Sequence, residues 1–279
     1  MAPDSVDAVK SLRDRTGAGI MDCKAALQSS GGDIEKAIDF LRKKGVAQAA
    51  KRAGREAKDG CVAARSQGSR AVLVEANCET DFVARTEDFK NLVALALEET
   101  VSHGEKAVSS EKVSQKVIEL SGKIGEKILV RRAKVVDSPQ GNLFTYIHSN
   151  QKLGVIVELA VGRAESRTSS LLVELGKNLA MQVAAANPIG ICREDIPPAA
   201  VDREIAIFRE EVKGKPENIL EKIIQGKLDK FYQANCFLEQ PFIKDDKVSV
   251  KQLLENTAKK LNDSIQIKQF VRFQLGESY

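Results

Sequence analysis

Hydrophobic residues recur every three or four positions in three groups within the first 45 residues. Two glycine-containing stretches, "TGAG" at 16–19 and "SSGG" at 29–32, separate the groups. The apolar positions are Val6, Val9 and Leu12, then Ile20, Cys23 and Leu27, then Ile34, Ile38 and Leu41. Asp33 suits the N-cap of the third group and Gly45 its end. The pattern predicts a small three-helix module over residues 1–45.

The next stretch, "VAQAAKRAGREAKD" at 46–59, is rich in alanine and basic. Its cations, Lys51, Arg52, Arg55 and Lys58, would attract a nucleic-acid backbone, but the segment contains no aromatic residue that stacks on bases. We therefore interpret it as a solvated linker, helical or extended.

The remaining sequence contains a weak internal repeat. "AVLVEANCETDFVARTEDFKNLVALALEETV" from 71 matches "GVIVELAVGRAESRTSSLLVELGKNLAMQVA" from 154, at an offset of 83, as a strand followed by an amphipathic helix. "IGEKILVRRAKV" from 124 matches "IQIKQFVRFQL" from 265 at an offset of 141, which predicts an insertion of 58 residues in the second copy. We expect two related α+β subdomains, 60–140 and 141–279, with sheets that are at least partly antiparallel.

The insertion, at about 190–245, has a helical pattern of its own. Two apolar stripes, Val201, Ile205, Phe208 and Val212, then Leu220, Ile224, Leu228 and Phe231, flank a "GKP" turn, with Pro216 in the first turn of the second helix. An antiparallel helical hairpin is predicted. Such a hairpin docks on its parent domain or pairs with another chain, and spacing does not choose between the two.

Composition places the chain among globular proteins of a reducing compartment. Hydrophobic residues make up 43% of the 279 positions, and the formal net charge is only +4. None of the five cysteines forms a CxxC pair, and no apolar run reaches the length of a membrane helix. We expect a cytoplasmic protein without a targeting segment.

Features of an enzyme are missing from the sequence. His103 and His148 are the two histidines, and neither lies in a pattern that combines a nucleophile, a base and an orienting acid. The chain has no GxxxxGK[ST] motif, and "GAGIMD" at 17–22 has Asp22 where a dinucleotide fingerprint needs its third glycine. We therefore expect no catalytic residue, no metal and no cofactor.

One short stretch, "CETDFVARTEDF" at 78–89, allows two interpretations. Spacing alone favours Phe82 as a residue that packs in the core beside a helix capped by Thr86. Alternatively "TDFV" is a loop tip on a rigid strand–helix frame, with Phe82 as an aromatic anchor for another protein. The corresponding stretch of the second copy, "GRAESRTSS", has no such pair, which favours the second interpretation.

Five motifs together resemble the translation elongation factor Ts family. They are "VKSLRDRTGAGIMDCKAAL" at 9–27, "GDIEKAIDFLRKKG" at 32–45, "NCETDFVAR" at 77–85, "KIGEKILVRRA" at 123–133, and "GKPENILEKIIQGKLDKFY" with "LEQPF" at 214–242. The resemblance extends over nearly the whole chain. It implies an α+β fold with a ubiquitin-associated-like N-terminal module, a duplicated core and a coiled-coil hairpin.

The resemblance also implies an activity and its residues. Members of the family promote guanine-nucleotide exchange on elongation factor Tu, a GTPase. Carried over by motif, Thr80, Asp81, Phe82 and Val83 form a wedge that disturbs the partner's magnesium site. Arg13, Ile20 and Met21 are the expected contacts of the N-terminal module, and His148 is the expected contact of the core. The turn "SNQK" after His148 departs from the glycine-bearing turn of the family.

Two other functions stay open at this point. A protein-binding adaptor would use the three-helix module and would not need Phe82. An RNA-binding protein would use the basic linker, with an affinity that falls steeply with salt, although we expect no direct nucleic-acid contact. The sequence stops after its last predicted core strand, so we expect no contact from the additional C-terminal module that some family members carry.

Overall fold

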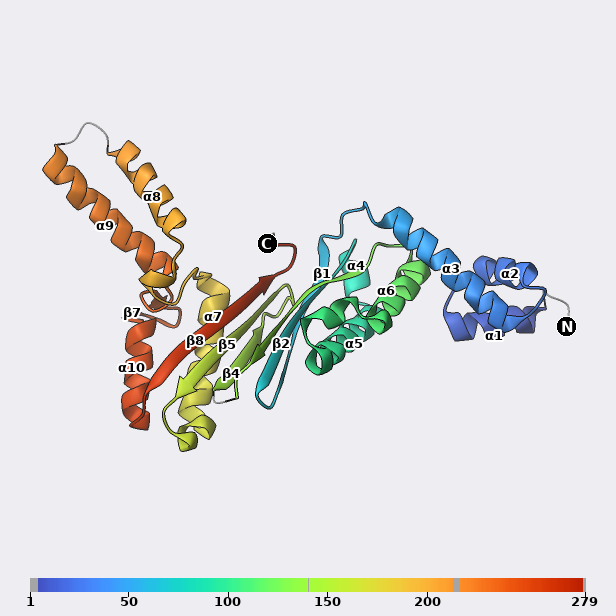
Figure 1. Cartoon of the computed structure of the whole chain (residues 1–279), viewed down its shortest axis with the longest axis horizontal. Coiled ribbons are helices and arrows are strands. Elements are labelled where there is room, and N and C mark those ends of the chain that lie inside the picture. Colours follow the sequence, from blue (N-terminus) through green and yellow to red (C-terminus); the bar gives the residue numbers. More distant parts are fainter. Residues whose placement is uncertain (1–4, 140, 213–215, 278–279) are drawn as a thin grey trace.

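The computed structural model describes residues 5–139, 141–212 and 216–277 of an elongated molecule. The N-terminal helices lie at one end, two sheets with their covering helices lie in the middle, and a pair of helices extends from the other end (Figure 1). This arrangement of helices with small antiparallel sheets confirms the predicted α+β class.

The N-terminal module consists of α1 (Val6–Thr16), α2 (Ile20–Ser29) and the first part of α3 (Ile34–Arg52). Its caps follow local chemistry: Gly17 ends α1 with a φ of 66°, and the Asp33 carboxylate accepts the N–H groups of Glu35 and Lys36 at the start of α3. A small core fills the module, formed by Leu12, Cys23, Ala26, Leu27 and Ala37.

The predicted helix end at Gly45 is wrong, because α3 continues to Arg52 through the alanine-rich stretch. Gly45 instead allows a close helix contact. A Cβ at Gly45 would lie 3.3 Å from Cγ2 of Ile118, and one at Gly122 would lie 4.0 Å from the Gly45 Cα. Ile118 and Gly122 both belong to α6 (Glu111–Ile124), so α3 links the module directly to the core.

The first half of the core is an antiparallel sheet covered by helices on one face. Its strands β1 (Asp59–Gln67), β2 (Arg70–Cys78) and β3 (Leu129–Asp137) lie in the order β1-β2-β3. After β2 come α4 (Asp81–Ala84), α5 (Glu87–His103), the 3₁₀ turn η1 (Glu105–Ser109) and α6. Phe89, Leu92, Val93 and Ala96 of α5 are all buried, and the Thr86 hydroxyl accepts the Phe89 N–H as predicted.

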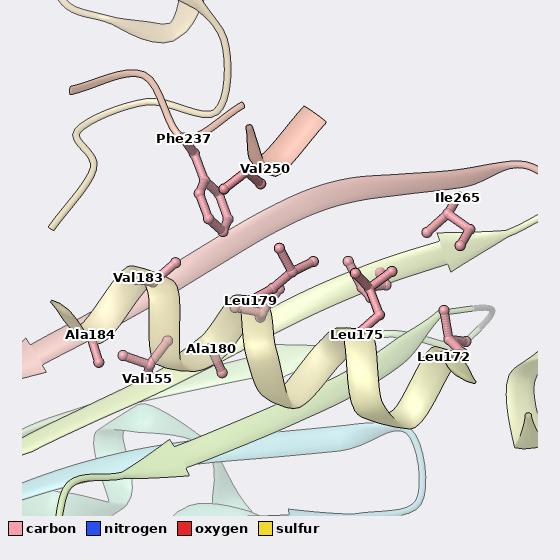
Figure 2. Packing of buried hydrophobic residues seen from close by; sticks show 12 residues of the cluster. Val155, Leu172, Leu175, Leu179, Ala180, Val183, Ala184, Phe237, Val250 and Ile265 are labelled. Carbon is pink, nitrogen blue, oxygen red and sulfur yellow. The ribbon is translucent and has the colours of Figure 1, made fainter. Parts of the chain in front are cut away.

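The second half repeats this plan. Its strands β4 (Asn142–Ile147), β5 (Leu153–Val161) and β8 (Ile265–Gln274) form an antiparallel sheet in the order β4-β5-β8. The turn η2 (Ala164–Thr168), α7 (Ser170–Ala186) and α10 (Val250–Leu261) follow the pattern of the first half. Figure 2 shows how Leu172, Leu175 and Leu179 of α7 pack over this sheet together with Phe237.

The two sheets pack against each other. Val62, Ala71, Leu73 and Val136 of the first sheet form one buried cluster with Ile156 and Phe273 of the second. Alternate residues of the central strands face the helices instead, Ala76 and Cys78 on β2 and Val155, Val157 and Leu159 on β5. Because each central strand is buried on both faces, its sequence is almost continuously apolar.

The register of the strands corrects the predicted offset of the second part of the repeat. Arg131 is the extra residue of a bulge, since Glu75 pairs with Arg132 and Ala76 with Val130. Lys268 has the same place in the second sheet, where Glu158 pairs with Gln269 and Leu159 with Ile267. The equivalence of 131 and 268 gives an offset of 137 instead of 141, and the ends of α6 and α10 agree with it. The insertion is therefore 54 residues long.

Most of the insertion is helical. After the 3₁₀ turn η3 (Arg193–Asp195), α8 (Pro198–Glu211) and α9 (Glu217–Asn235) lie side by side (Figure 1). Pro216 stands at the N-cap of α9, and residues 213–215 of the predicted turn lie outside the described residues. The apolar stripes are half-buried apart from Val212, which is buried. The strands β6 (Pro241–Phe242) and β7 (Asp245–Ser249) then lead into α10.

The base of α8 and α9 is held by two buried amides. The Gln182 amide donates to the Gln240 side-chain oxygen at 3.2 Å and to the Pro241 carbonyl at 3.2 Å. Gln240 in turn donates to the carbonyls of Ala186 at 3.2 Å and Ala234 at 2.7 Å. This network ties α7, the end of α9 and β6 together. In the described part of the chain, no helix is both long and apolar enough to span a membrane.

Candidate functional site

Phe82 lies on a one-turn helix and points into solvent. The helix α4 follows the central strand β2 directly, and the Thr80 hydroxyl caps it by accepting the Val83 N–H at 3.4 Å. The Phe82 side chain is 79% exposed. The interpretation of Phe82 as a core residue is therefore wrong, and "TDFV" is a capped helical turn instead of a loop tip.

The other side of this turn is anchored in the protein. Val83 is only 7% exposed and belongs to the core cluster beneath α5, with Cys78 and Phe89. At its end, the Val83 carbonyl accepts the Thr86 N–H at 3.0 Å and the Thr86 hydroxyl at 2.8 Å. Of the four predicted wedge residues, Val83 thus anchors the turn, and Phe82 is the one that projects.

Asp81 is paired within the turn. Its carboxylate accepts a hydrogen bond from the Arg85 guanidinium at 2.8 Å, and both groups are exposed enough to exchange partners with solvent. Because the pair is exposed, separating it costs little free energy. Asp81 is therefore available to another protein that approaches Phe82.

A carboxylate distant in sequence holds the residues that precede Phe82. One oxygen of Glu126 accepts the backbone N–H groups of Glu79 and Thr80, each at 3.1 Å, and the other accepts the Thr80 hydroxyl at 2.7 Å. Glu79 reciprocates, since it accepts the Lys127 N–H at 2.6 Å. That hydrogen bond, with the Arg55 guanidinium beside the carboxylate, lowers the pKa of Glu79. Sequence reasoning assigned no role to Glu126, and its place in "KIGEK" was the available signal.

The N-terminal candidates flank the turn between α1 and α2. Ile20 and Met21 open α2 and are 55% and 75% exposed, although both are large apolar side chains. Arg13 is exposed near the end of α1, where its carbonyl accepts the N–H of Gly17. The three residues form an apolar surface with one cation beside it, separate from Phe82.

His148 is exposed in the turn between β4 and β5. The Tyr146 hydroxyl lies 2.9 Å from its Nδ1, and its carbonyl accepts the Gln151 N–H at 2.8 Å. Gln151 has a φ of 57°, in the region that glycine adopts most easily, which is the physical cost of lacking a glycine in this turn.

The turn that carries His148 and the helix α4 adjoin the same end of β1. The Gln151 carbonyl accepts the Val62 N–H at 2.7 Å, and Lys152 forms an ion pair with Asp59 at 2.7 Å. Asp59 lies opposite Cys78, and α4 contacts β1. The structure thus brings His148 and Phe82 to one region, with the N-terminal candidates on a separate module.

Cations of the basic linker are engaged with protein groups. Arg52 donates to the Ser121 carbonyl at 3.1 Å, Arg55 pairs with Glu79 at 3.2 Å, and Lys58 pairs with Glu56 at 2.6 Å. These contacts give the segment a structural role between the module and the core.

The described residues hold no cluster of three or more histidine, cysteine, aspartate or glutamate side chains that suits a metal ion. Burial raises the pKa of the Cys61 thiol to about 11 and that of Cys78 to about 12, so both thiols stay protonated and behave as core residues. What the surface offers is a set of exposed apolar side chains on firmly held turns. The fold and the site therefore define a protein-binding factor.

Comparison with known sequences agrees with this class. The family model described as "Elongation factor TS" matches residues 79–277. Proteins named "Elongation factor Ts" from Prosthecochloris aestuarii and Chlorobium chlorochromatii are each 44% identical over 99% of this chain and 100% of their own length. The protein of that name from Nitratidesulfovibrio vulgaris is 41% identical over 96% of this chain and 94% of its own. The chain belongs to the elongation factor Ts family, and so to the exchange factors of translation elongation.

Proposed function

We propose that this protein promotes release of GDP from elongation factor Tu, so that GTP binds in its place. The observation that carries the proposal is Phe82, a large ring 79% exposed on a turn whose two ends are fixed to the core. Aromatic side chains held in this way dominate the energy of protein interfaces. In the proposed complex the ring enters the GTPase beside its magnesium site, and Asp81 leaves Arg85 to hold the displaced segment.

A small displacement is enough to weaken the magnesium site. Mg²⁺ needs near-ideal octahedral geometry with ligands at about 2.1 Å. When its surroundings move, the ion is lost, the phosphate charge is no longer neutralised and the nucleotide dissociates. The exchange factor itself therefore needs neither a catalytic group nor a cofactor.

Linkage sets the energy that this mechanism requires. If GDP binds with nanomolar affinity, about 12 kcal/mol holds it. A factor that binds the nucleotide-free GTPase more tightly weakens GDP by the same ratio. Release that is ten thousand times faster needs about 5.5 kcal/mol off the barrier. GTP then fills the site by mass action, and the factor accelerates exchange in both directions.

The proposed contacts divide between two parts of the chain. The apolar surface of Ile20 and Met21, with Arg13 beside it, binds the GTPase through the N-terminal module, and His148 contacts it from the core. In the proposed domain organisation, residues 1–45 form a ubiquitin-associated-like module, 46–59 a linker, 60–140 and 141–279 the two subdomains, and 190–245 a coiled-coil hairpin. The partner's presence in the cytoplasm places the activity there.

Release of fluorescent GDP from purified elongation factor Tu tests the proposal, with catalytic amounts of the parent protein, Phe82→Ala and Ile207→Ala. Ile207 is a matched control, because it is an exposed apolar residue on α8, far from Phe82 in the structure (Figure 1). We expect strong acceleration by the parent and Ile207→Ala, and a loss of at least tenfold in Phe82→Ala. A folded parent protein that leaves the release rate unchanged would refute the exchange function.

A further inference from the structure

We propose that Glu126 is a positioning residue for the exchange activity: its carboxylate fixes the segment before α4 and so sets the direction in which Phe82 projects. This inference rests on the proposed function. Glu126 is half-buried and follows α6, so it belongs to a different element from the residues that it holds.

The contacts of Glu126 involve every hydrogen-bond donor at the start of the turn. Its two oxygens accept the Glu79 N–H, the Thr80 N–H and the Thr80 hydroxyl, at 3.1, 3.1 and 2.7 Å. Hydrogen bonds to a charged acceptor are stronger than neutral ones. The Thr80 side chain is thereby fixed in the rotamer in which it also caps α4. Two residues separate these contacts from the exposed ring.

Glu126 is itself fixed in position. The left-handed Gly125, with a φ of 89°, ends α6 and turns the chain toward β2. The Ser121 hydroxyl donates to the Glu126 carbonyl at 2.6 Å. Lys127 extends the cluster to the end of α3, because its ammonium donates to the carbonyls of Ala53 and Arg55, both at 2.7 Å. The carboxylate thus acts from a rigid support.

The geometry separates a positioning role from a role in stability or in direct binding. Val83 and Thr86 anchor the far end of α4 without help from Glu126. Removing the carboxylate therefore frees the near end, where the amides of Glu79 and Thr80 lose their acceptor. Phe82 remains exposed but is no longer held in one direction, so insertion into the GTPase becomes slower while the rest of the interface is unchanged.

Two substitutions distinguish the parts of this role. Glu126→Ala removes all three contacts. Glu126→Gln keeps one oxygen for the two backbone N–H groups, and its amide can donate to the Thr80 hydroxyl oxygen. Glu119→Ala is the matched control, since Glu119 is an exposed carboxylate on α6 that pairs with Lys116 at 3.0 Å.

The experiment measures GDP release from elongation factor Tu over a range of factor concentrations, with the parent, Glu126→Ala, Glu126→Gln, Glu119→Ala, Phe82→Ala and the double variant Glu126→Ala/Phe82→Ala. We expect Glu126→Ala to lower the maximal rate about tenfold, with less than about a threefold change in the concentration for half-maximal rate. Glu126→Gln should recover most of the loss, and Glu119→Ala should equal the parent. The double variant should match Phe82→Ala within about twofold, because Glu126 acts through the ring.

Hydrogen exchange of the Glu79 and Thr80 amides is the second measurement, and it should be faster in Glu126→Ala than in Glu119→Ala. The inference is overturned if these amides exchange equally in both variants, or if Glu126→Ala lowers the rate by the same factor with and without Phe82. A parent that accelerates release while Glu126→Ala equals it also overturns the inference and leaves the exchange function intact. A parent without activity refutes both.

Discussion

Replacing Glu75 by glutamine tests what joins the two sheets. Glu75 is fully buried on β2 and accepts three hydrogen bonds, from Arg131 at 3.0 Å, from Arg132 at 2.6 Å and from the Gly276 N–H at 2.9 Å. Arg132 also donates to the Gln274 carbonyl at 3.0 Å and lies over the Phe273 ring. The carboxylate therefore connects the first sheet to the end of β8 in the second.

The expected cost follows from burial. Removing one partner of a buried ion pair costs about 3–5 kcal/mol, because the other charge remains in a place shielded from water. Glutamine keeps the volume and one acceptor, which places Glu75→Gln near the lower limit, about 3 kcal/mol. For a chain of this size, that loss lowers Tm by about 6–12 °C.

The repeat provides the control. Glu158 occupies the equivalent position of β5, but it is half-buried and accepts from neutral groups, the Ser138 hydroxyl and the Gln269 amide. Glu158→Gln should cost about 1 kcal/mol or less. Urea unfolding of the parent and both variants, followed by circular dichroism, measures the difference. The reasoning is refuted if the two variants lose the same stability within about 1 kcal/mol.

Other predictions concern acid stability, two glycines, the base of α8 and α9, and the thiols. Burial alone would raise the pKa of Glu75, but the hydrogen bonds from Gly276, Arg132 and Arg131 outweigh it and the pKa is lowered; its stabilisation is present above about pH 4.3 and is lost as the pH falls through the lower folded value, so urea midpoints between pH 6 and 3 should fall more steeply in the parent than in Glu75→Gln. Gly176→Ala should destabilise by about 1–3 kcal/mol in urea unfolding, because its Cβ would lie 2.2 Å from Cγ of Phe144, whereas Gly226→Ala, in open space on α9, should stabilise by up to about 1 kcal/mol; equal signs would contradict the packing. Gln240→Leu should accelerate hydrogen exchange at the end of α9 and in β6, and unchanged exchange there would show that the amide network does not hold this base. The buried thiols of Cys61 and Cys78, with pKa values raised to about 11 and 12, should react with an aromatic disulfide only after urea is added, and rapid labelling of the native protein at pH 8 would contradict their burial.

Local chemistry explains which features the sequence predicted well. The caps at Asp33 and Thr86 depend on donors two or three residues away, and the structure confirms both. The apolar stripe of α5 and the almost continuous apolar run of β5 reflect burial in a regular element, so their elements were also predictable. The antiparallel pairing followed from the hairpin signals around the turn at 148–152.

Contacts between distant residues explain the features that the sequence did not reveal. Gly45 has the form of a helix end, and only its contact with Ile118 shows that it lies between two helices. The repeat offset was wrong by four because Val130 and Arg131 resemble Val271 and Arg272, whereas the bulges align Arg131 with Lys268. In the candidate site, the exposure of Phe82 and the hold of Glu126 on Thr80 both depend on packing between β2 and α6.

The contact of Gly45 with α6 has a consequence for binding kinetics. Two patches joined by a flexible tether meet their partner independently, and the second one binds at an effective concentration set by the length of the tether. Here α3 is continuous to Arg52 and rests on α6, so the patch of Ile20 and Met21 stays at a fixed separation from Phe82. Once one patch has bound the proposed partner, the other is already at its target. An exchange factor built in this way makes both contacts together and loses them together, which favours brief, complete encounters over slow partial release.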